Sequence, residues 1–448
     1  MHVVFRESHG LEETDTPADL GQDPADLVVL SFSDSDLGAF AEGWRRGGGP
    51  DGHLPTLRLA NLSALRHPLS VDTYVENTLA GASGVLIRLI GGAPYWEYGL
   101  QRVQATAQAK GIAVAVLPAD GREDARLDTA STLPRSTLRR LSHLCDAGGA
   151  VAAQAALAQM ALAAGLYAAP VRGNKSLPMV GAWTPEDGVA CPLVDMPQGD
   201  APRVLIVFYR SYLVAADLAP ITALVEACRA EGYHARALFA PSLKAPEVAG
   251  WLARQVRAYA PDAIVNATSF SGKGADGTSP LDAGGVPVLQ AALATSTKEA
   301  WAEAGRGLSP ADLAMHVVLP EVDGRLMGGV VSFKEPGTRD PDLQFSRYAH
   351  AADAERVGAV VARLRGWLEM ARTPAAERRV ALVLSTYPGK TWNMGHAVGL
   401  DAPASARAIL SDLAQAGYDV PAQMPELEAR LLTGDIALPL KTYRAHLA

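Results

Sequence analysis

Apolar and polar positions along the chain follow two alternating rhythms. Short apolar runs closed by polar residues, such as DLVVLSFS at 26–33 and IAVAVLP at 112–118, predict buried strands. Segments such as LGAFAEGWRRG at 37–47 and YGLQRVQATAQAKG at 98–111 place apolar residues at helical spacing. Strands that alternate with helices are typical of a parallel sheet with crossover connections. We therefore predict an α/β fold of successive open, mostly parallel-sheet domains with helices on both faces, plus a helical connector.

Changes in this rhythm divide the chain into four expected segments. They are an N-terminal α/β domain at 1–125, a helical segment with a Pro/Gly-rich connector at 126–200, a second α/β domain at 201–375, and the start of a third α/β domain, expected to be truncated, at 376–448. The expected strands are 2–7, 26–33, 84–92, 112–118, 203–211, 234–243, 262–270, 286–293, 316–324 and 378–388, with late helices at 352–372 and 403–418. A single βα unit cannot cover both faces of its strand. We therefore expect the chain to be a piece of a longer polypeptide.

Composition narrows the class of protein. The chain has 448 residues, a net charge of −8 and no long basic run, which argues against nucleic-acid binding. Cys145, Cys191 and Cys228 are far apart and form no CxxC pair, as expected for reduced thiols in the cytoplasm. The Ala-rich stretch 150–169 is too weakly apolar for a membrane span, and MHVVFRESHG does not resemble an export signal. We expect no stable membrane insertion.

Two glycine-containing motifs resemble nucleotide-binding loops, but neither fits its context. GKGADG at 272–277 matches GxGxxG, yet TSPLDAGGVPV follows it and cannot supply the helix that holds a pyrophosphate. PGKT at 388–391 lacks the earlier glycine of a phosphate loop, since Leu384 stands there, and Pro388 removes an amide donor. We expect a polar loop at the first motif and no ATP site at the second, so that ATP, if used, is hydrolysed by another chain.

Polar residues at the expected strand ends are the candidates for chemistry, because open α/β sheets bind ligands at the carboxyl ends of their strands. Glu321 has no turn propensity and follows Pro320 in an expected apolar strand, where loss of water would suit it to proton or metal exchange. Asp323 precedes a glycine and is also explained by a turn. The other candidates are Tyr209, Arg210, Gln290, Lys334, Lys390, Trp392 and His396.

Several of these candidates have a structural alternative. Arg210 is equally explained as a capping or ion-pair residue and as an anion clamp. Lys334 could simply pair with Glu335 or Glu321, and Trp392 could be a packed loop aromatic. The scattered histidines each need local support before they are assigned as ligands.

Seven blocks together resemble the large, substrate-binding subunit of aerobic cobaltochelatase, a family related to the magnesium chelatase large subunit. They include FYRSYLVAADLAPITALVEACRAEGY, PDAIVNATSF, KEAWAEAGRGLSPADLAMHVVLPEVDG and YPGKTWNMGHAVGLDAPASARAIL. The opening FRESHGLEETDTPADLGQDPADLVVLSFSDSDLGAFAEGW resembles the cobalt branch. The resemblance runs over nearly the whole chain and implies that more than half of the large subunit is missing.

The resemblance implies ATP-dependent insertion of Co²⁺ into hydrogenobyrinic acid a,c-diamide during aerobic cobalamin biosynthesis, which is ligase chemistry that forms nitrogen–metal bonds. It also implies that an AAA+ ATPase subunit and its companion use ATP and Mg²⁺, whereas this chain holds the tetrapyrrole and the metal. On this basis we expect Glu321, with Asp323, to accept a proton or hold the metal, and Glu321 and His396 to be metal ligands. Most family members have a small or amide residue where His396 stands.

The remaining six candidates are expected to bind the substrate. Cationic side chains would meet the carboxylates of the macrocycle, and Tyr209 or Trp392 would stack on its face. Three alternatives stay open: a magnesium chelatase large subunit acting on protoporphyrin IX, a non-catalytic tetrapyrrole-binding scaffold, and an unrelated α/β sugar- or phosphate-binding protein.

Overall fold

Four short apolar strands form a parallel sheet in the N-terminal part of the chain. β1 (Leu27–Ser31), β2 (Leu57–Asn61), β3 (Gly84–Leu89) and β4 (Ala113–Pro118) lie in the order β2-β1-β3-β4, and every adjacent pair is parallel. The computed structural model describes residues 17–119, 124–173, 176–190, 199–384, 399–421, 423–433 and 437–447. The strand expected at 2–7 lies outside these residues. Strands that are buried on both faces are almost wholly apolar, which explains why three of these four were predictable from sequence.

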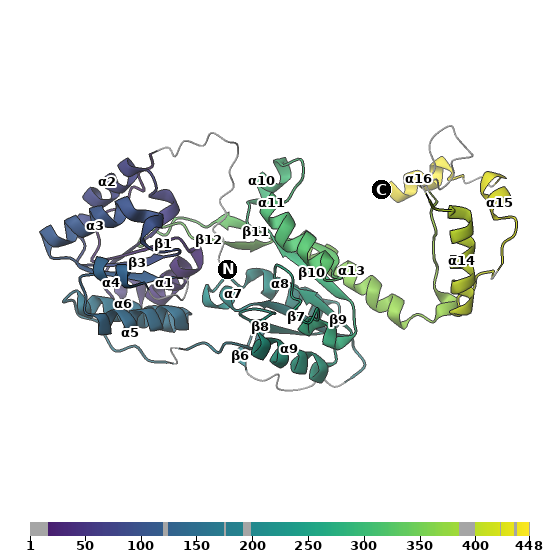
Figure 1. Ribbon diagram of the computed structural model, residues 1–448, viewed down its shortest axis with the longest axis horizontal. Coiled ribbons are helices and arrows are strands. Elements are labelled where there is room, and N and C mark those ends of the chain that lie inside the picture. Colours follow the sequence, from purple (N-terminus) through teal and green to yellow (C-terminus); the bar gives the residue numbers. More distant parts are fainter. Residues whose placement is uncertain are drawn as a thin grey trace. The chain divides into compact units, whose positions relative to one another are not determined.

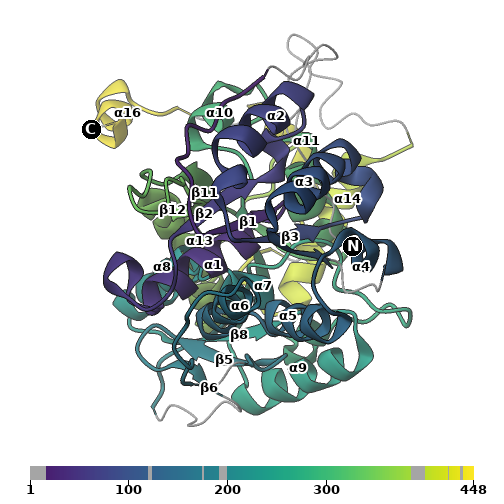
Figure 2. The same cartoon turned by 90° about the vertical axis from the view of Figure 1, so that its left-hand side faces the viewer.

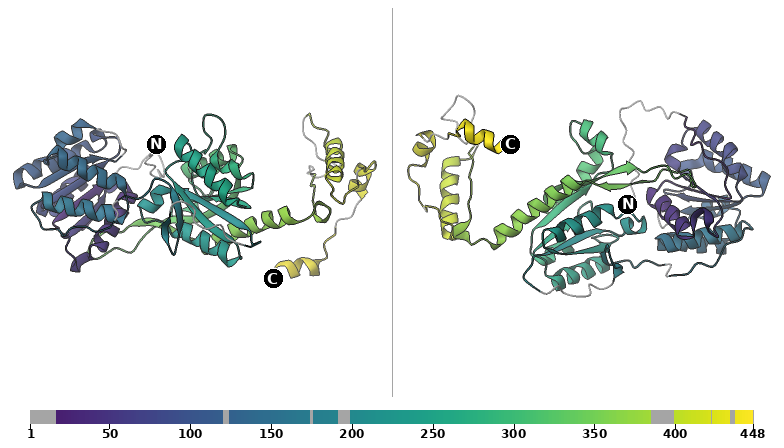
Figure 3. Two further views of the ribbon diagram at one scale, coloured as in Figure 1. Left: turned by 90° about the horizontal axis from the view of Figure 1, so that it is seen from below. Right: turned by 180° about the vertical axis from the view of Figure 1, so that it is seen from behind.

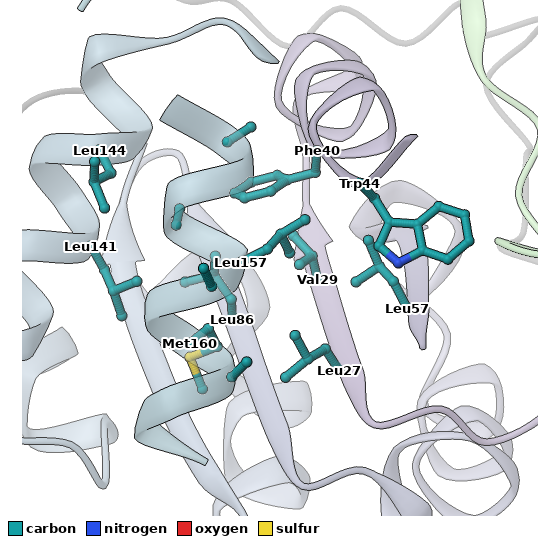
Figure 4. Packing of buried hydrophobic residues seen from close by; sticks show 14 of the residues in the cluster. Leu27, Val29, Phe40, Trp44, Leu57, Leu86, Leu141, Leu144, Leu157 and Met160 are labelled. Carbon is teal, nitrogen blue, oxygen red and sulfur yellow. The ribbon is translucent and has the colours of Figure 1, made fainter. Parts of the chain in front are cut away.

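Helices cover both faces of this sheet (Figure 2). They are α1 (Asp34–Arg46), α2 (Pro68–Asn77), α3 (Glu97–Lys110), α4 (Ala125–Ala130), α5 (Arg135–Ala147) and α6 (Ala150–Ala163). α1, α5 and α6 pack on one face, and α2, α3 and α4 pack on the other. On the first face, Phe40 and Trp44 of α1 lie over Val29 of β1, beside Leu157 of α6 (Figure 4). The Ala-rich stretch is therefore a buried helix, as predicted.

A second, larger sheet has eight strands in the order β12-β11-β10-β9-β7-β8-β5-β6. They are β5 (Gly181–Thr184), β6 (Gly188–Ala190), β7 (Arg203–Tyr209), β8 (His234–Ala240), β9 (Ala263–Asn266), β10 (Val288–Leu293), β11 (Leu326–Pro336) and β12 (Tyr348–Ala352). The strands from β8 to β11 in this order are parallel, whereas β5, β6 and β12 run antiparallel at the two edges. The expected α/β fold with mostly parallel sheets is confirmed. The edge strands β5 and β6 were not predicted, because 181–190 has no clear apolar period.

Helices also lie on both faces of the second sheet (Figure 3). They are α7 (Arg210–Val214), α8 (Ala219–Ala230), α9 (Pro246–Tyr259), α10 (Lys298–Glu303) and α13 (Ala354–Arg372), with a 3-10 turn η5 (Pro280–Gly284). α9 packs with η5 on one face, around Leu252, Val256 and Tyr259. GKGADG lies in a loop before η5, as expected, and no α-helix begins there.

The strand expected at 316–324 is wrong, because this segment is helical. α11 (Pro310–Leu313) continues through a π-helical turn η6 (Ala314–Val318) into α12 (Leu319–Val322). Ser309 caps the start by accepting from the Asp312 amide at 3.1 Å. The π turn lies immediately before Pro320, which lacks the N–H of a regular α-helical turn. A short apolar run such as HVVL fits either a strand or a helix, so its composition was misleading.

The connection between β11 and β12 joins the two sheets of this part of the chain (Figure 1). Leu343, in that connection, is only 1% exposed and belongs to the apolar core of the N-terminal sheet. The Arg58 guanidinium donates to the Asp342 carbonyl at 2.8 Å, and the Gln22 amide donates to the Gln344 carbonyl at 2.9 Å. The β11–β12 connection therefore attaches the second sheet to the N-terminal sheet through apolar packing and hydrogen bonds.

The chain divides into two compact units, 1–364 and 365–448. Helices in the second unit are α14 (Ala402–Gln415), α15 (Leu427–Thr433) and α16 (Leu440–Leu447). Residues 378–384 form no strand, so that part of the strand expected at 378–388 is wrong, and 385–388 lies outside the described residues. Within the described residues, no helix is long and apolar enough to cross a membrane.

Candidate functional site

The order of strands in the second sheet points to its ligand-binding edge. β7 lies between β8 and β9 in the sheet. The chain leaves β7 toward β8 and leaves β9 toward β10, which are opposite directions along the strand order. Ligands of open α/β sheets bind at the carboxyl ends of strands at such a switch point. Tyr209 ends β7 here, and its hydroxyl donates to the Ser269 carbonyl at 2.5 Å in the loop after β9. Burial raises the pKa of Tyr209 and keeps the phenol protonated.

Arg210 follows directly, but its guanidinium holds the backbone of the connector. It donates to the carbonyls of Ala147 at 2.7 Å, Leu177 at 3.0 Å and Pro178 at 2.9 Å. Burial lowers the pKa of Arg210. These contacts favour the structural alternative for this residue, and a contact with substrate carboxylates stays a prediction.

Gln290 and Lys334 are also engaged within the chain. Gln290 is buried between β9 and β10, where it accepts from the Asn266 side chain at 2.8 Å and donates to the Thr268 carbonyl at 2.6 Å. The Lys334 ammonium pairs with Asp34 of α1 at 2.6 Å, rather than with either acidic partner suggested by the sequence. Lys334 thereby links the second sheet to the N-terminal domain.

Glu321 and Asp323 have opposite environments. Asp323 is buried, and its carboxylate accepts from the Ser271 hydroxyl at 2.8 Å and from the Gly272 amide at 2.6 Å. It therefore fixes the loop after β9. Glu321 lies in α12, exposed, and forms no ion pair or side-chain hydrogen bond with a described residue. The expected burial of Glu321 in a strand is wrong, so any desolvation of its carboxylate must come from outside the described chain.

The remaining three candidates, Lys390, Trp392 and His396, lie outside the described residues. Across the residues that the structure describes, no group of three or more His, Cys, Asp or Glu side chains is arranged to hold a metal ion. The metal-ligand assignments of Glu321 and His396 therefore stay predictions.

A buried polar cluster at the same edge was missed from sequence. We call it the histidine cluster; it comprises Tyr212, Asp217, Asp312, His316 and His350. Asp217 accepts from the His350 amide at 2.9 Å and lies 2.8 Å from its Nδ1 atom, while the Tyr212 ring packs edge-on against His350. His316 Nε2 lies 3.9 Å from Asp312. The i,i+4 spacing of Asp312 and His316 is the only sequence signal, and it required a helix rather than a strand.

Burial and neighbouring charges have opposing effects on the pKa values of groups in the histidine cluster. Burial disfavours ionisation of Asp217, but the hydrogen bonds and charge of His350 lower its pKa below the ordinary value. Burial lowers the pKa of His316 to about 4, although the charge of Asp312 raises it and that of His350 lowers it further. His316 Nδ1 and His350 Nε2 are both buried without a hydrogen-bond partner in the described chain. The cluster can exchange protons, but His316 is neutral at pH 7.

Comparison with known proteins gives these features a family. Residues 143–439 match the family model described as CobN/Magnesium Chelatase. The chain is 35% identical to aerobic cobaltochelatase subunit CobN of Sinorhizobium sp and 37% identical to that of Pseudomonas aeruginosa, each over 97% of this chain and 35% of the relative. A magnesium-chelatase subunit of Rhodobacter capsulatus is 25% identical over 53% of this chain and 21% of its own length.

A solved structure extends the similarity to three dimensions. The catalytic subunit of cobaltochelatase from Mycobacterium tuberculosis aligns with a TM-score of 0.59 and 28% identity, over 90% of this chain and 32% of that chain. The chain thus spans about a third of the length of these cobaltochelatase relatives. The match to the family model covers well over half of the chain. The chain belongs to the CobN/magnesium chelatase family.

Proposed function

We propose that this chain forms part of the large subunit of an aerobic cobaltochelatase, which inserts Co²⁺ into hydrogenobyrinic acid a,c-diamide in cobalamin biosynthesis. The observation that carries the proposal is the extent of similarity. The CobN relatives match 97% of this chain, N-terminal sheet included, whereas the magnesium chelatase subunit of Rhodobacter capsulatus matches 53%. The cobaltochelatase relatives therefore account for more of this chain than the magnesium chelatase subunit does in that comparison.

Metal insertion sets a clear chemical requirement. The inner nitrogens of the macrocycle must lose protons as they bind Co²⁺, and the metal must lose water. A carboxylate can accept such a proton or hold the incoming ion. We assign this role to Glu321, because its carboxylate is exposed and forms no ion pair or side-chain hydrogen bond with a described residue. Asp323, proposed as its companion, lies two residues further along the chain and holds the loop after β9 by accepting from Ser271 and Gly272.

The other residues proposed to bind the substrate or the metal differ in the hydrogen bonds and ion pairs that their side chains already form. Tyr209 is at the switch point, where its hydroxyl donates to the Ser269 carbonyl, and Arg210, Gln290 and Lys334 also make internal bonds. A substrate would have to replace these contacts. Lys390, Trp392 and His396 complete the proposed set from outside the described residues.

We assign the ATP hydrolysis that supplies free energy for metal insertion to partner chains. We propose that an AAA+ ATPase subunit and its companion bind ATP and Mg²⁺ and act on the large subunit. Support comes from the loop at 272–277, where no helix begins that could hold a phosphate group.

The test is a reconstituted insertion assay followed by the absorbance of the macrocycle. The complex should insert Co²⁺ into hydrogenobyrinic acid a,c-diamide with ATP, and Glu321→Gln should reduce kcat by about 100-fold, as expected for loss of a general base. Glu303→Gln, an exposed glutamate of α10, is the matched control and should retain full activity. Insertion of Mg²⁺ into protoporphyrin IX instead would assign the magnesium branch. Tight macrocycle binding without turnover would identify a scaffold, and an unchanged rate in Glu321→Gln would remove the role of that residue.

A further inference from the structure

The helical segment 310–322 buries two polar side chains and exposes several apolar ones. Asp312 and His316 are 0% and 3% exposed, whereas Val318 and Val322 are 49% and 70% exposed. Surface helices normally place their apolar residues toward the core. The exposed valine and leucine side chains leave an apolar surface on this segment, which lies between α10 and β11, and exposed apolar patches of this kind mark interaction sites.

The loop after β9 enlarges this surface. We call the combined surface the apolar face; its members are Phe270, Leu313, Val318, Leu319 and Val322. The Phe270 amide donates to the Met315 carbonyl at 2.7 Å, which places the loop against the helical segment. Phe270 has a backbone φ of 65° and is one of four non-glycine residues described in the left-handed region. Such strained residues are concentrated at binding sites.

Two charged groups lie on the apolar face. Glu321 is next to Val322 in α12, and the Lys273 ammonium lies 3.4 Å from the Val322 carbonyl. Neither side chain forms an ion pair with a described residue. Within the described part of the chain, one unpaired carboxylate and one unpaired ammonium thus lie beside exposed apolar residues of α12, next to the start of β11.

We infer that the tetrapyrrole macrocycle binds flat against the apolar face, with Glu321 toward the inner nitrogens and Lys273 toward a rim carboxylate. This inference rests on the proposed function and adds the surface on which the substrate lies. The match is chemical: the macrocycle has apolar ring atoms that can pack on apolar side chains, its inner N–H is a proton donor, and its rim bears carboxylates. A bound ring would exclude water from Glu321, and loss of water favours the protonated form of a carboxylate. The substrate itself therefore supplies the desolvation that the described chain does not.

The inference is tested by equilibrium binding, using the full chain purified with its native partner subunits and metal-free hydrogenobyrinic acid a,c-diamide as the probe. Val318→Ser combined with Val322→Ser should raise the Kd about 20-fold, on the scale of two valine side chains returned to water. The matched control, Leu69→Ser with Leu162→Ser, changes two exposed apolar residues of the N-terminal domain and should leave the Kd unchanged. Lys273→Gln should weaken the diamide but not a fully amidated analogue that lacks rim carboxylates.

The outcomes separate this inference from the proposed function. If the wild-type chain binds the macrocycle and the Val318/Val322 variant binds equally well, the inference is overturned while the chelatase proposal stands. If that variant keeps its Kd but loses its partner subunits in sedimentation, the apolar face docks protein, and the inference is again wrong. Absence of macrocycle binding by the wild-type complex overturns both proposals.

Discussion

The buried imidazole of His316 makes the stability of the chain depend on pH in a calculable way. Burial lowers the pKa of His316 from 6.5 to about 4. Folding therefore favours the neutral ring, and the unfolded chain binds a proton at a pH where the folded chain does not. The contribution of His316 to stability is complete above pH 6.5 and is lost progressively as the pH falls from 6.5 toward 4.

The size of the effect follows from these two pKa values. The difference between 6.5 and about 4, at about 1.4 kcal/mol for each pH unit, gives a total loss of about 3 kcal/mol. At pH 5 the unfolded histidine is almost fully protonated and the folded one is mostly neutral, so about 2 kcal/mol is lost relative to pH 7. Asp217 does not contribute in this window, because its pKa is held below 3.8 and its protonation begins only at lower pH.

The assay compares urea unfolding of the wild type and His316→Gln at pH 7 and pH 5. Glutamine does not titrate and retains an amide that can donate toward Asp312. The free energy of unfolding should fall by about 2 kcal/mol more in the wild type than in the variant between these two values. An equal fall in both proteins would refute the reasoning, as would an NMR titration that places the imidazole of His316 near pH 6.5.

Two further predictions follow from the contacts at the same edge. Asp323→Ala should lower the free energy of unfolding by about 3 kcal/mol, because it removes two charge-assisted hydrogen bonds and leaves the Gly272 amide buried without a partner. Glu321→Gln should change the free energy of unfolding by less than about 0.5 kcal/mol. A similar loss in both variants would contradict the environments assigned to these two carboxylates. Arg210→Leu removes three bonds to backbone carbonyls, so limited proteolysis should cut the connector at 176–180 at least about tenfold faster than in the wild type; cleavage at the wild-type rate would mean that those bonds do not hold the connector.

Sequence patterns predicted the parallel strands well and the partners of polar residues poorly. The runs that became β1, β7 and β10 are mostly apolar, because helices cover both of their faces. The prediction for segment 310–322 failed because Asp312 and His316 are buried while Val318 and Val322 are exposed, which departs from the pattern on which such predictions depend. The local pattern of apolar and polar residues does not show which side chains of a helix are buried in the folded chain.

The candidate site illustrates the same limit at the level of single contacts. Lys334 was expected to pair with Glu335 or Glu321 or to bind substrate, but its observed partner, Asp34, lies 300 positions away. Asp323 was assigned either to a turn or to catalysis; it does lie in the turn after α12, but its carboxylate also holds a loop from another strand, which the sequence did not indicate. Tyr209 was placed correctly because the rule on strand ends depends only on topology. Long-range pairs require the fold before they can be assigned.

The contribution of Leu343 to the N-terminal core has a consequence for synthesis on the ribosome. The last helix of that core, α6, ends at Ala163, so 180 further residues must be translated before Leu343 appears. At about 5–20 residues per second this takes on the order of ten to forty seconds. During that interval the nascent N-terminal domain exposes the apolar surface that Leu343 later covers. That surface is a natural binding site for chaperones, and a domain expressed without the β11–β12 connection would retain it permanently.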